Sequence, residues 1–463
     1  MAIALINDLT VNLAAVSRGL SRGLGRFTED GDPLFKGKRT VVDGVESYAG
    51  NVDWWGWPLI IILVKALIAF GVCVLCTALL IWYLRKFIAD MQNRIGPNRA
   101  GPYGLLQTLA DGTKLFFKEA LWPRNAEKTI FRLAPYIAAV PAFLTFCVIP
   151  LGGVVDVAGY RTNLQVADPP MGVLFSLALS SIAVYGVMLA GWASGSKYPL
   201  MGSVRASAQM ISYEAALGLS LAAVVLYTGS LSTRKIVAAQ EGAIWNWHAI
   251  STIFVPFVIF AIAAVAELNH PPFDLVEAES ELVGGFHTEY TGARFAMFYL
   301  AEFMNQITMS ALVVTLFLGG PNMPFNLGTA LRLDQIPGIG GFLGALVGSS
   351  SPLWLALKVF ILVSILVGIR ATLPRLRYDQ LMDLGWKRMI PLALGWLLIL
   401  GARQAGVDTA SRLAYMFLAL TGCLVAWGLL WAAMRVGRRT AQEEYSALTG
   451  SGSQVPGSRA GRL

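Results

Sequence analysis

The sequence predicts an all-α polytopic membrane protein with about nine transmembrane helices. Of the 463 residues, 56% are hydrophobic and only 14% are charged, so a soluble surface could not be covered with polar side chains. Runs of about 20 apolar residues, the length that crosses a bilayer, recur along the chain. Tryptophans such as Trp54, Trp55 and Trp245 lie at the edges of these runs, where an indole prefers the lipid headgroup layer.

The apolar runs give the predicted spans in chain order: 58–83, 131–151, 171–193, 211–229, 252–268, 296–318, 353–373, 389–402 and 413–434. The run at 389–402 is short, but including it makes the distribution of Lys and Arg over the loops consistent. The predicted organisation is an extra-cytoplasmic N-terminal extension at 1–57, an eight-helix membrane core at 58–402, an additional C-terminal transmembrane helix at 403–435 and a disordered cytoplasmic tail at 436–463. The extension lacks the pattern of a signal peptide.

The basic residues predict the orientation of the spans. With the N-terminus outside and the C-terminus in the cytoplasm, the inside loops carry 22 Lys and Arg and the outside segments 12. The net charge of +8 comes from residues that flank apolar runs and form no basic stripe with interleaved aromatics, which argues against nucleic-acid binding. Cys73 and Cys76 form a C-x-x-C pair, but two thiols are too few for a zinc or iron–sulfur site, so no metal site is predicted.

Three glutamates at or within apolar runs are the first candidates for function: Glu214, Glu267 and Glu302. A charge near the centre of a membrane helix costs about 2.5 to 3.5 kcal/mol on insertion scales, so each one requires a reason. One alternative is that each simply caps a helix or pairs with a charge near the membrane surface. Their number favours a shared function.

The loop after Glu267 is unusually acidic for an inside loop, because it contains five carboxylates and a single arginine, Arg294. If the loop is helical, Glu277 and Glu281 share a face, whereas Glu279 points elsewhere. Neighbouring carboxylates raise one another's pKa and can then hold and pass protons near neutral pH. The sequence therefore predicts a proton path through Glu214, Glu267, Glu302, Glu277, Glu279 and Glu281. The alternative is a solvated loop that docks onto a basic partner.

The first inside loop has the opposite charge. It is rich in Gly-Pro turns and basic residues and ends in a predicted amphipathic helix at 105–117, a combination that on its own suits binding to anionic lipids.

Several motifs together resemble the family of the H subunit of bacterial NADH:quinone oxidoreductase, respiratory complex I, whose mitochondrial counterpart is NADH dehydrogenase subunit 1. The resemblance covers about 58–402. Its most specific stretches are Gly96-Pro97-Asn98-Arg99, Gly101-Pro102-Tyr103-Gly104, Ser212-Tyr213-Glu214, Ala266-Glu267-Leu268-Asn269, Pro272-Phe273-Asp274-Leu275 and Glu279-Ser280-Glu281-Leu282.

The resemblance implies a membrane subunit of a proton-pumping enzyme in a bacterial inner membrane. Such a subunit encloses a quinone chamber together with the peripheral arm and couples quinone reduction to proton translocation through its intramembrane glutamates. It binds no redox cofactor, since FMN and iron–sulfur clusters belong to partner subunits. Its expected partners are the peripheral-arm quinone-module subunits, adjacent membrane subunits, ubiquinone or menaquinone, and membrane lipids. The inside loops, which combine apolar walls with convergent polar groups, supply the candidate quinone-binding residues Arg85, Arg94, Tyr103, Asp111, Lys114, Phe273 and Asp274.

Three features depart from the family pattern. Leu84 precedes Arg85-Lys86 where an acidic residue is usual, with Asp90 as a candidate substitute, and His270 follows Asn269 where an arginine is usual. The N-terminal extension and the span at 413–434 lie outside the usual eight helices. Two other functions stay open: the related membrane subunit of a hydrogenase or of a deazaflavin-dependent dehydrogenase, and an autonomous ion transporter, for which the sequence lacks paired broken helices.

Overall fold

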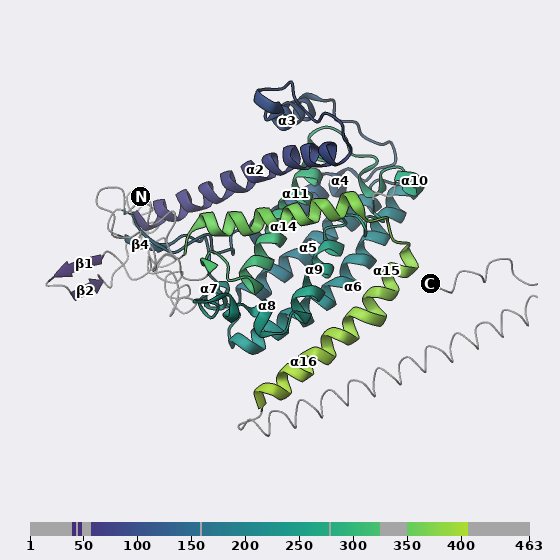
Figure 1. Ribbon diagram of the computed structural model, residues 1–463. Coiled ribbons are helices and arrows are strands. Elements are labelled where there is room, and N and C mark those ends of the chain that lie inside the picture. Colours follow the sequence, from purple (N-terminus) through teal and green to yellow (C-terminus); the bar gives the residue numbers. More distant parts are fainter. Residues whose placement is uncertain are drawn as a thin grey trace, which may run out of the picture. The chain divides into compact units, whose positions relative to one another are not determined.

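In a computed structural model, the described residues are 39–42, 45–48, 57–157, 160–276, 279–324 and 350–405, and they are mostly helical (Figure 1). This confirms the predicted fold class. Within these residues, seven helical segments are long and apolar enough to cross a membrane: α2 (Trp57–Met91), α4 (Lys128–Phe146), α5 (Gly172–Ala193), α6 (Lys197–Thr228), α11 (Ala293–Phe317), α14 (Pro352–Thr372) and the continuous segment Tyr378–Gln404. The predicted span at 413–434 lies outside the described residues.

The predicted span at 252–268 is a short apolar helix, α9 (Val255–Glu267). Its 13 residues extend about 20 Å at 1.5 Å per residue, which is less than the roughly 30 Å of a hydrocarbon core. The carboxyl end of this short helix is Glu267, and it is buried. A potential charge therefore sits where a helix stops inside the protein.

Two helices are longer than their apolar runs predicted. Helix α2 continues beyond 83 to Met91 and carries Arg85 and Lys86, because the first helix-breaking pair, Gly96-Pro97, comes later. Helix α6 begins at Lys197, well before the predicted start at 211. Polar residues in its first half, including Ser203 and Gln209, are buried against other elements. Hydropathy alone misses such a segment, because its polar groups are paired within the protein.

Short elements connect the long helices. The predicted amphipathic helix is confirmed as α3 (Gln107–Phe117), which follows the turn η2 (Pro102–Gly104). The others are α7 (Thr233–Ala238), η3 (Ile244–Asn246), α8 (His248–Ser251), α10 (Glu279–Leu282) and η4 (Gly285–His287). Two antiparallel hairpins were not predicted: β1 (Arg39–Val42) with β2 (Val45–Tyr48), and β3 (Val154–Val157) with β4 (Tyr160–Asn163).

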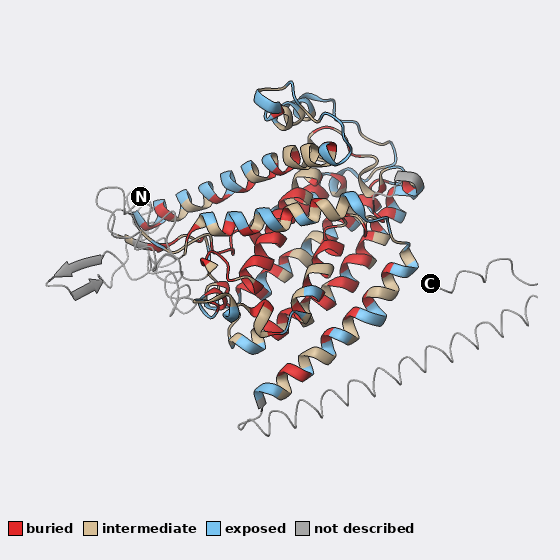
Figure 2. Cartoon of the chain, in the orientation of Figure 1, coloured by how far each residue is buried: buried red, intermediate tan, exposed pale blue. Residues whose placement is uncertain are grey.

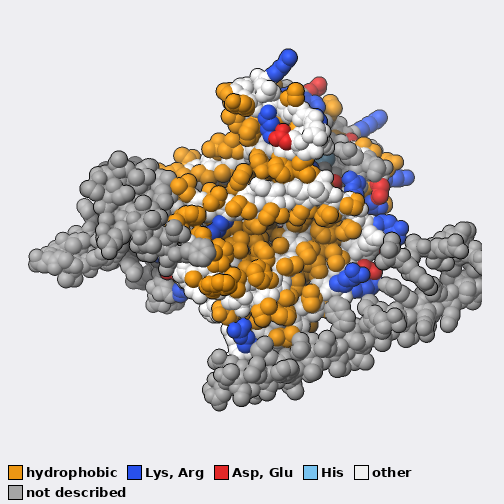
Figure 3. All heavy atoms as spheres, in the orientation of Figure 1, with side chains coloured by type: hydrophobic (Ala, Val, Ile, Leu, Met, Phe, Trp, Pro, Cys, Tyr) orange, Lys and Arg blue, Asp and Glu red, His pale blue; other side chains and the backbone are white. Residues whose placement is uncertain are grey.

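Buried residues concentrate in α4, α5, α6, α9 and α11 (Figure 2). Glycines allow close packing here, since a Cβ added to Gly186 of α5 would lie 2.7 Å from the Ala138 backbone nitrogen of α4. In contrast, only 17% of the residues in the most apolar stretch of α2, and of α14, are buried, whereas 83% are buried in that of α11. Hydrophobic side chains cover the face of the molecule formed by α2 and α14 (Figure 3). These two helices are therefore on the outside of the bundle, where lipid or partner subunits can contact them.

One buried lysine ties the end of α11 to α14. The Lys358 ammonium donates hydrogen bonds to the carbonyls of Leu318 at 2.7 Å, Gly320 at 3.0 Å and Asn322 at 2.7 Å. Carbonyls at a helix carboxyl end lack partners within the helix, and a cation there is favourable. Lys358 thus satisfies the turn that follows α11.

The last described segment contains a π-helical turn. Helix α15 (Tyr378–Leu384) passes through η7 (Gly385–Met389) into α16 (Ile390–Ala405), which contains most of the predicted span at 389–402. The Tyr213 hydroxyl of α6 donates a 2.9 Å hydrogen bond to the carbonyl of Leu381. The described helices up to Ala393 belong to one compact unit, and all the site residues discussed below lie in it.

Candidate functional site

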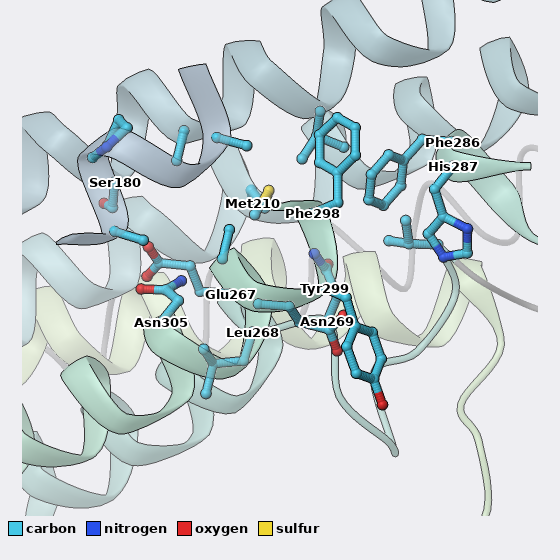
Figure 4. Close-up of a pocket in the computed structure, with 18 of the residues that line it drawn as sticks. Ser180, Met210, Glu267, Leu268, Asn269, Phe286, His287, Phe298, Tyr299 and Asn305 are labelled. Atoms are coloured by element: carbon cyan, nitrogen blue, oxygen red, sulfur yellow. The ribbon is translucent and has the colours of Figure 1, made fainter. Parts of the chain in front are cut away.

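A cavity of about 80 Å³ lies among α4, α5, α6, α9 and α11 (Figure 4). One water molecule needs roughly 10 to 15 Å³ of such space, so the cavity has room for several. Most of its wall is apolar, with residues such as Met210 and Phe298. The polar groups that line it are Thr145, Ser180, Glu267, Asn269, His287, Tyr299, Glu302 and Asn305.

Glu267 is the most enclosed carboxyl group of the site. It is 3% exposed, and its Oε2 atom has no hydrogen-bond partner among the described residues. The side chains of Ser180 and Asn305 lie toward it in the cavity (Figure 4). A buried polar atom without a partner is costly, and water in a polar cavity of this size can supply the missing hydrogen bond.

Glu302 of α11 lines the same cavity and contacts a histidine. Its Oε1 atom lies 3.3 Å from His270 Nδ1, and His270 Nε2 lies 3.1 Å from Gln306 Oε1. His270 is 5% exposed. Its place in the sequence is where the family pattern has an arginine, and the structure puts it against a carboxyl group of the site. An imidazole can exchange a proton at one nitrogen for a proton at the other, which a guanidinium cannot do.

Glu214 lies on the other side of α5 from the cavity, in a groove between α5 and α6 lined by Leu174, Leu177 and Ile211. The Ser181 hydroxyl donates a hydrogen bond to its Oε1 atom. Glu214 and Glu267 are close enough to interact electrostatically. Adjacent serines of α5 therefore face two carboxyl groups, Ser180 on the cavity side and Ser181 on the groove side. The structure brings all three predicted glutamates into one region.

The predicted quinone residues Arg85, Asp111 and Lys114 also meet. Arg85 Nη1, near the end of α2, lies 2.6 Å from Asp111 Oδ2 of α3, and Lys114 Nζ lies 3.5 Å from Asp111 Oδ1. Partial burial acts to raise the pKa of Asp111, but the Arg85 hydrogen bond and the charges of Arg85 and Lys114 lower that pKa below its usual value. Asp111 is thus held as a carboxylate, and the ion pair fixes α3 to α2.

The other predicted quinone residues have different environments. Asp274 Oδ2 lies 3.4 Å from Arg375 Nη2. Phe273 is 5% exposed and packs in the core, 5.7 Å from the Tyr213 ring, so its ring does not face open space in this chain. Tyr103 is 75% exposed and adopts a positive φ of 54°.

Arg94 is exposed and donates through Nε to Gln92 Oε1 at 2.6 Å. Asp90, the candidate substitute for the missing acidic residue, is also exposed, at the last turn of α2.

The acidic loop is only partly described. Glu281, in the single turn α10, forms a 2.7 Å ion pair with Arg205 of α6. The side chain of Glu279 and the whole of Glu277 lie outside the described residues. The predicted sharing of one helix face by Glu277 and Glu281 therefore stays a prediction.

Gln209 is a residue of the site that sequence reasoning missed. Its amide donates to the carbonyls of Ala266 at 2.7 Å and Phe273 at 2.9 Å and to Asn269 Oδ1 at 3.1 Å, which fixes the end of α9 and the start of the acidic loop. A glutamine two residues before the predicted span at 211–229 was the available signal, and extending that span would have placed it inside the bundle.

Comparison with known proteins identifies the family of the chain. The sequence model of the NADH dehydrogenase family matches residues 64–401. The chain belongs to this family. Among curated relatives in the family, a protein from Frankia casuarinae that is named as the H subunit of NADH-quinone oxidoreductase is 51% identical over 343 residues, 74% of this chain and 72% of the relative. A protein of the same name from Frankia alni is 50% identical over 344 residues, again 74% and 72% of the two chains. The matched region contains every candidate site residue.

Proposed function

We propose that this chain is a membrane subunit of a proton-pumping NADH-quinone oxidoreductase, which it joins with other subunits in a bacterial inner membrane. The names of its relatives and the family match support that role. The observation that carries the coupling part is that Glu267 and Glu302 line one cavity with room for several water molecules. Quinone is the substrate of the complex, and FMN and iron–sulfur clusters belong to its other subunits.

Protons would pass through the bundle in short steps. Water in the cavity connects Glu302 and its partner His270 with Glu267. From Glu267, the serine pair of α5 leads to Glu214, which lies in a groove open to the outer face of the bundle. Carboxyl groups, hydroxyls, imidazole and water can all donate and accept a proton, which is what each step of such a path requires. The acidic loop with Glu277, Glu279 and Glu281 supplies the entrance.

The quinone end of the path would lie at the predicted inside loops. There the Arg85–Asp111 ion pair and Lys114 provide fixed charge beside α3, with exposed Tyr103 nearby in sequence. Asp274 and Arg94 contribute further polar groups, and Phe273 supports the loop from within the core. This division assigns charge and shape to the quinone-binding residues of the loops, and proton transfer to the bundle and the acidic stretch that contains Glu277, Glu279 and Glu281.

The test is Glu267→Gln in the assembled complex, which keeps shape and hydrogen bonding but removes titration. We expect oxidation of NADH by an artificial acceptor to stay normal, while quinone-linked proton translocation falls by at least about ten-fold, since a positioned acid–base group typically contributes roughly 100-fold or more. The matched control is Glu241→Gln, since Glu241 is an exposed carboxylate of the loop between α7 and η3. Normal translocation in an assembled Glu267→Gln complex contradicts the proposal.

Glu214→Gln tests the exit of the path separately. We expect it to leave assembly and artificial-acceptor activity intact and to depress both quinone reduction and proton translocation. If Glu214 only stabilises the α5–α6 contact through Ser181, the substitution changes assembly or nothing at all. Full proton translocation in assembled Glu214→Gln membranes removes Glu214 from the path.

A further inference from the structure

A basic and aromatic cluster lies where α4 and α11 begin, away from the carboxyl groups described above. The guanidinium carbons of Arg132 and Arg294 lie 4.9 and 3.6 Å from the centroid of one indole ring, that of Trp122. Phe131 stacks on Tyr290 with centroids 4.0 Å apart and planes at 8°, and Arg294 lies 5.7 Å from the Phe131 ring. Aromatic rings thus hold two cations on one tryptophan.

These two arginines differ from the arginines of the loops. Arg85, Arg205 and Arg375 each form an ion pair with a carboxylate. Within the described part of the chain, neither Arg132 nor Arg294 has a carboxylate within 4 Å, although Glu127 lies only one residue before α4. Two like charges on one ring repel each other, and both helices direct their positive N-terminal ends to this region. The site has an excess of positive charge.

The geometry of the cluster leaves hydrogen-bond donors available. A guanidinium stacked on an aromatic face keeps its N–H groups in the plane of the guanidinium, pointing away from the ring. Two guanidinium groups on one indole can each donate charge-assisted hydrogen bonds to the oxygens of one phosphate group. The Tyr136 side chain lies close enough to Arg294 to interact with it electrostatically.

An exposed apolar stripe of α4 continues from Arg132 along the helix. Leu133, Tyr136 and Val140 are 52%, 55% and 51% exposed, and their spacing of three and four residues puts them on one face. This face belongs to a helix of membrane-spanning composition. The stripe therefore presents an apolar surface that starts beside the two cations.

We propose that Arg132 and Arg294 bind the phosphate of an anionic phospholipid whose acyl chains lie along Leu133, Tyr136 and Val140. Both halves of such a lipid have a matching surface, since the phosphate neutralises the two arginines and the acyl chains cover the stripe. An acidic segment of a partner subunit would match the cations but would leave the stripe to something else. This site uses none of the predicted quinone-binding residues and does not rest on the proton path.

The experiment uses the whole complex reconstituted in phosphatidylcholine nanodiscs with a small fraction of phosphatidylglycerol that carries a photoactivatable acyl chain. After illumination, mass spectrometry locates the labelled peptides. We expect label on the α4 peptide that contains Tyr136 and Val140. The double variant Arg132→Gln with Arg294→Gln should raise the fraction of phosphatidylglycerol needed for half-maximal labelling by roughly 30-fold. This is the change expected for two arginines that contribute about 1 kcal/mol each.

Two variants sharpen the result. Arg388→Gln removes an exposed arginine elsewhere and should leave labelling of α4 unchanged, whereas the double Arg→Lys variant should retain part of it, because charge is kept but the planar donor pair is lost. The wild-type complex alone can also overturn the proposal, whether or not the double variant assembles. Absence of label on α4, equal labelling by a photoactivatable phosphatidylcholine, or a partner subunit's carboxylate at the two arginines in a map of the complex would each do so.

Discussion

The carboxyl groups of the loops and those of the bundle have different partners. In the loops, Asp111, Glu281 and Asp274 lie 2.6, 2.7 and 3.4 Å from arginine nitrogens. In the bundle, Glu214 accepts from a serine hydroxyl, Glu302 faces an imidazole, and Glu267 borders a cavity. Arginine stays protonated at any physiological pH, and Arg85 together with Lys114 keeps the pKa of Asp111 below its usual value. Hydroxyl, imidazole and water instead allow the partner to gain and lose a proton. Carboxyl side chains therefore have two kinds of environment in this chain, paired with arginine in the loops and beside proton-exchanging groups in the bundle.

The largest effect should come from placing a positively charged side chain, as in the loops, beside a carboxyl group of the bundle. Asn305→Lys would place an ammonium in the cavity beside Glu267 and hold that carboxyl as an anion. We expect quinone-linked proton translocation in membrane vesicles to fall by more than about ten-fold, with assembly and artificial-acceptor activity retained. Asn305→Met, similar in length but uncharged, is the control and should stay within about two-fold of wild type. Equal losses in both variants would mean that packing, not charge, matters at this position.

A smaller effect should follow from breaking a loop pair. A double-mutant cycle of Arg85→Gln and Asp111→Asn measures the coupling between the two residues in the apparent KM for quinone. Since this ion pair is partly exposed, we expect about 1 kcal/mol, or about five-fold. The double variant should then be less impaired than the two single effects combined. Additive effects of the two substitutions would show that the pair does not act as a unit on the quinone site.

The smallest effect concerns pH. A lowered pKa means that the Asp111 ion pair is fully present above the ordinary carboxyl value near 3.9 and is lost only as pH falls through the lower folded value. Between about pH 5.5 and about pH 8, Asp111 should therefore stay ionised. The ratio of wild-type to Asp111→Asn quinone kinetics should then be constant across this range. A ratio that changes several-fold would mean that Asp111 gains and loses a proton in this range, as the carboxyl groups of the bundle are proposed to do.

Much of the fold could be predicted from hydropathy, because a bilayer requires long apolar helices. The errors have a physical cause. The start of α6 was placed too late since buried Ser203 and Gln209 resemble surface residues until their partners are known. The β1–β2 hairpin was missed even though Asp43-Gly44, a frequent two-residue turn, separates its strands in the sequence.

The candidate site could be predicted only in part. The cost of intramembrane charge identified Glu214, Glu267 and Glu302, and the structure puts them in one region. Ser180, Ser181 and Asn305 gave no such signal, because small polar residues are common in membrane helices for packing alone.

The environment of Phe273 could not be predicted from the sequence either. Its apolar ring suits a quinone wall as well as a core, and in this chain it is 5% exposed and packs against Tyr213.

The π-helical turn Gly385–Met389 sets the helical phase of the segment that contains it. Leu381, Gly385, Met389 and Ala393 are all buried, at intervals of four residues. In an uninterrupted α-helix, residues twelve positions apart differ by about 120° around the axis, so Leu381 and Ala393 would face different directions. The π turn accommodates one extra residue, which reduces this difference to about 20°. One insertion therefore keeps a four-residue repeat facing the core, and Leu381 can hold Tyr213, the neighbour of Glu214, while Ala393 still packs inside.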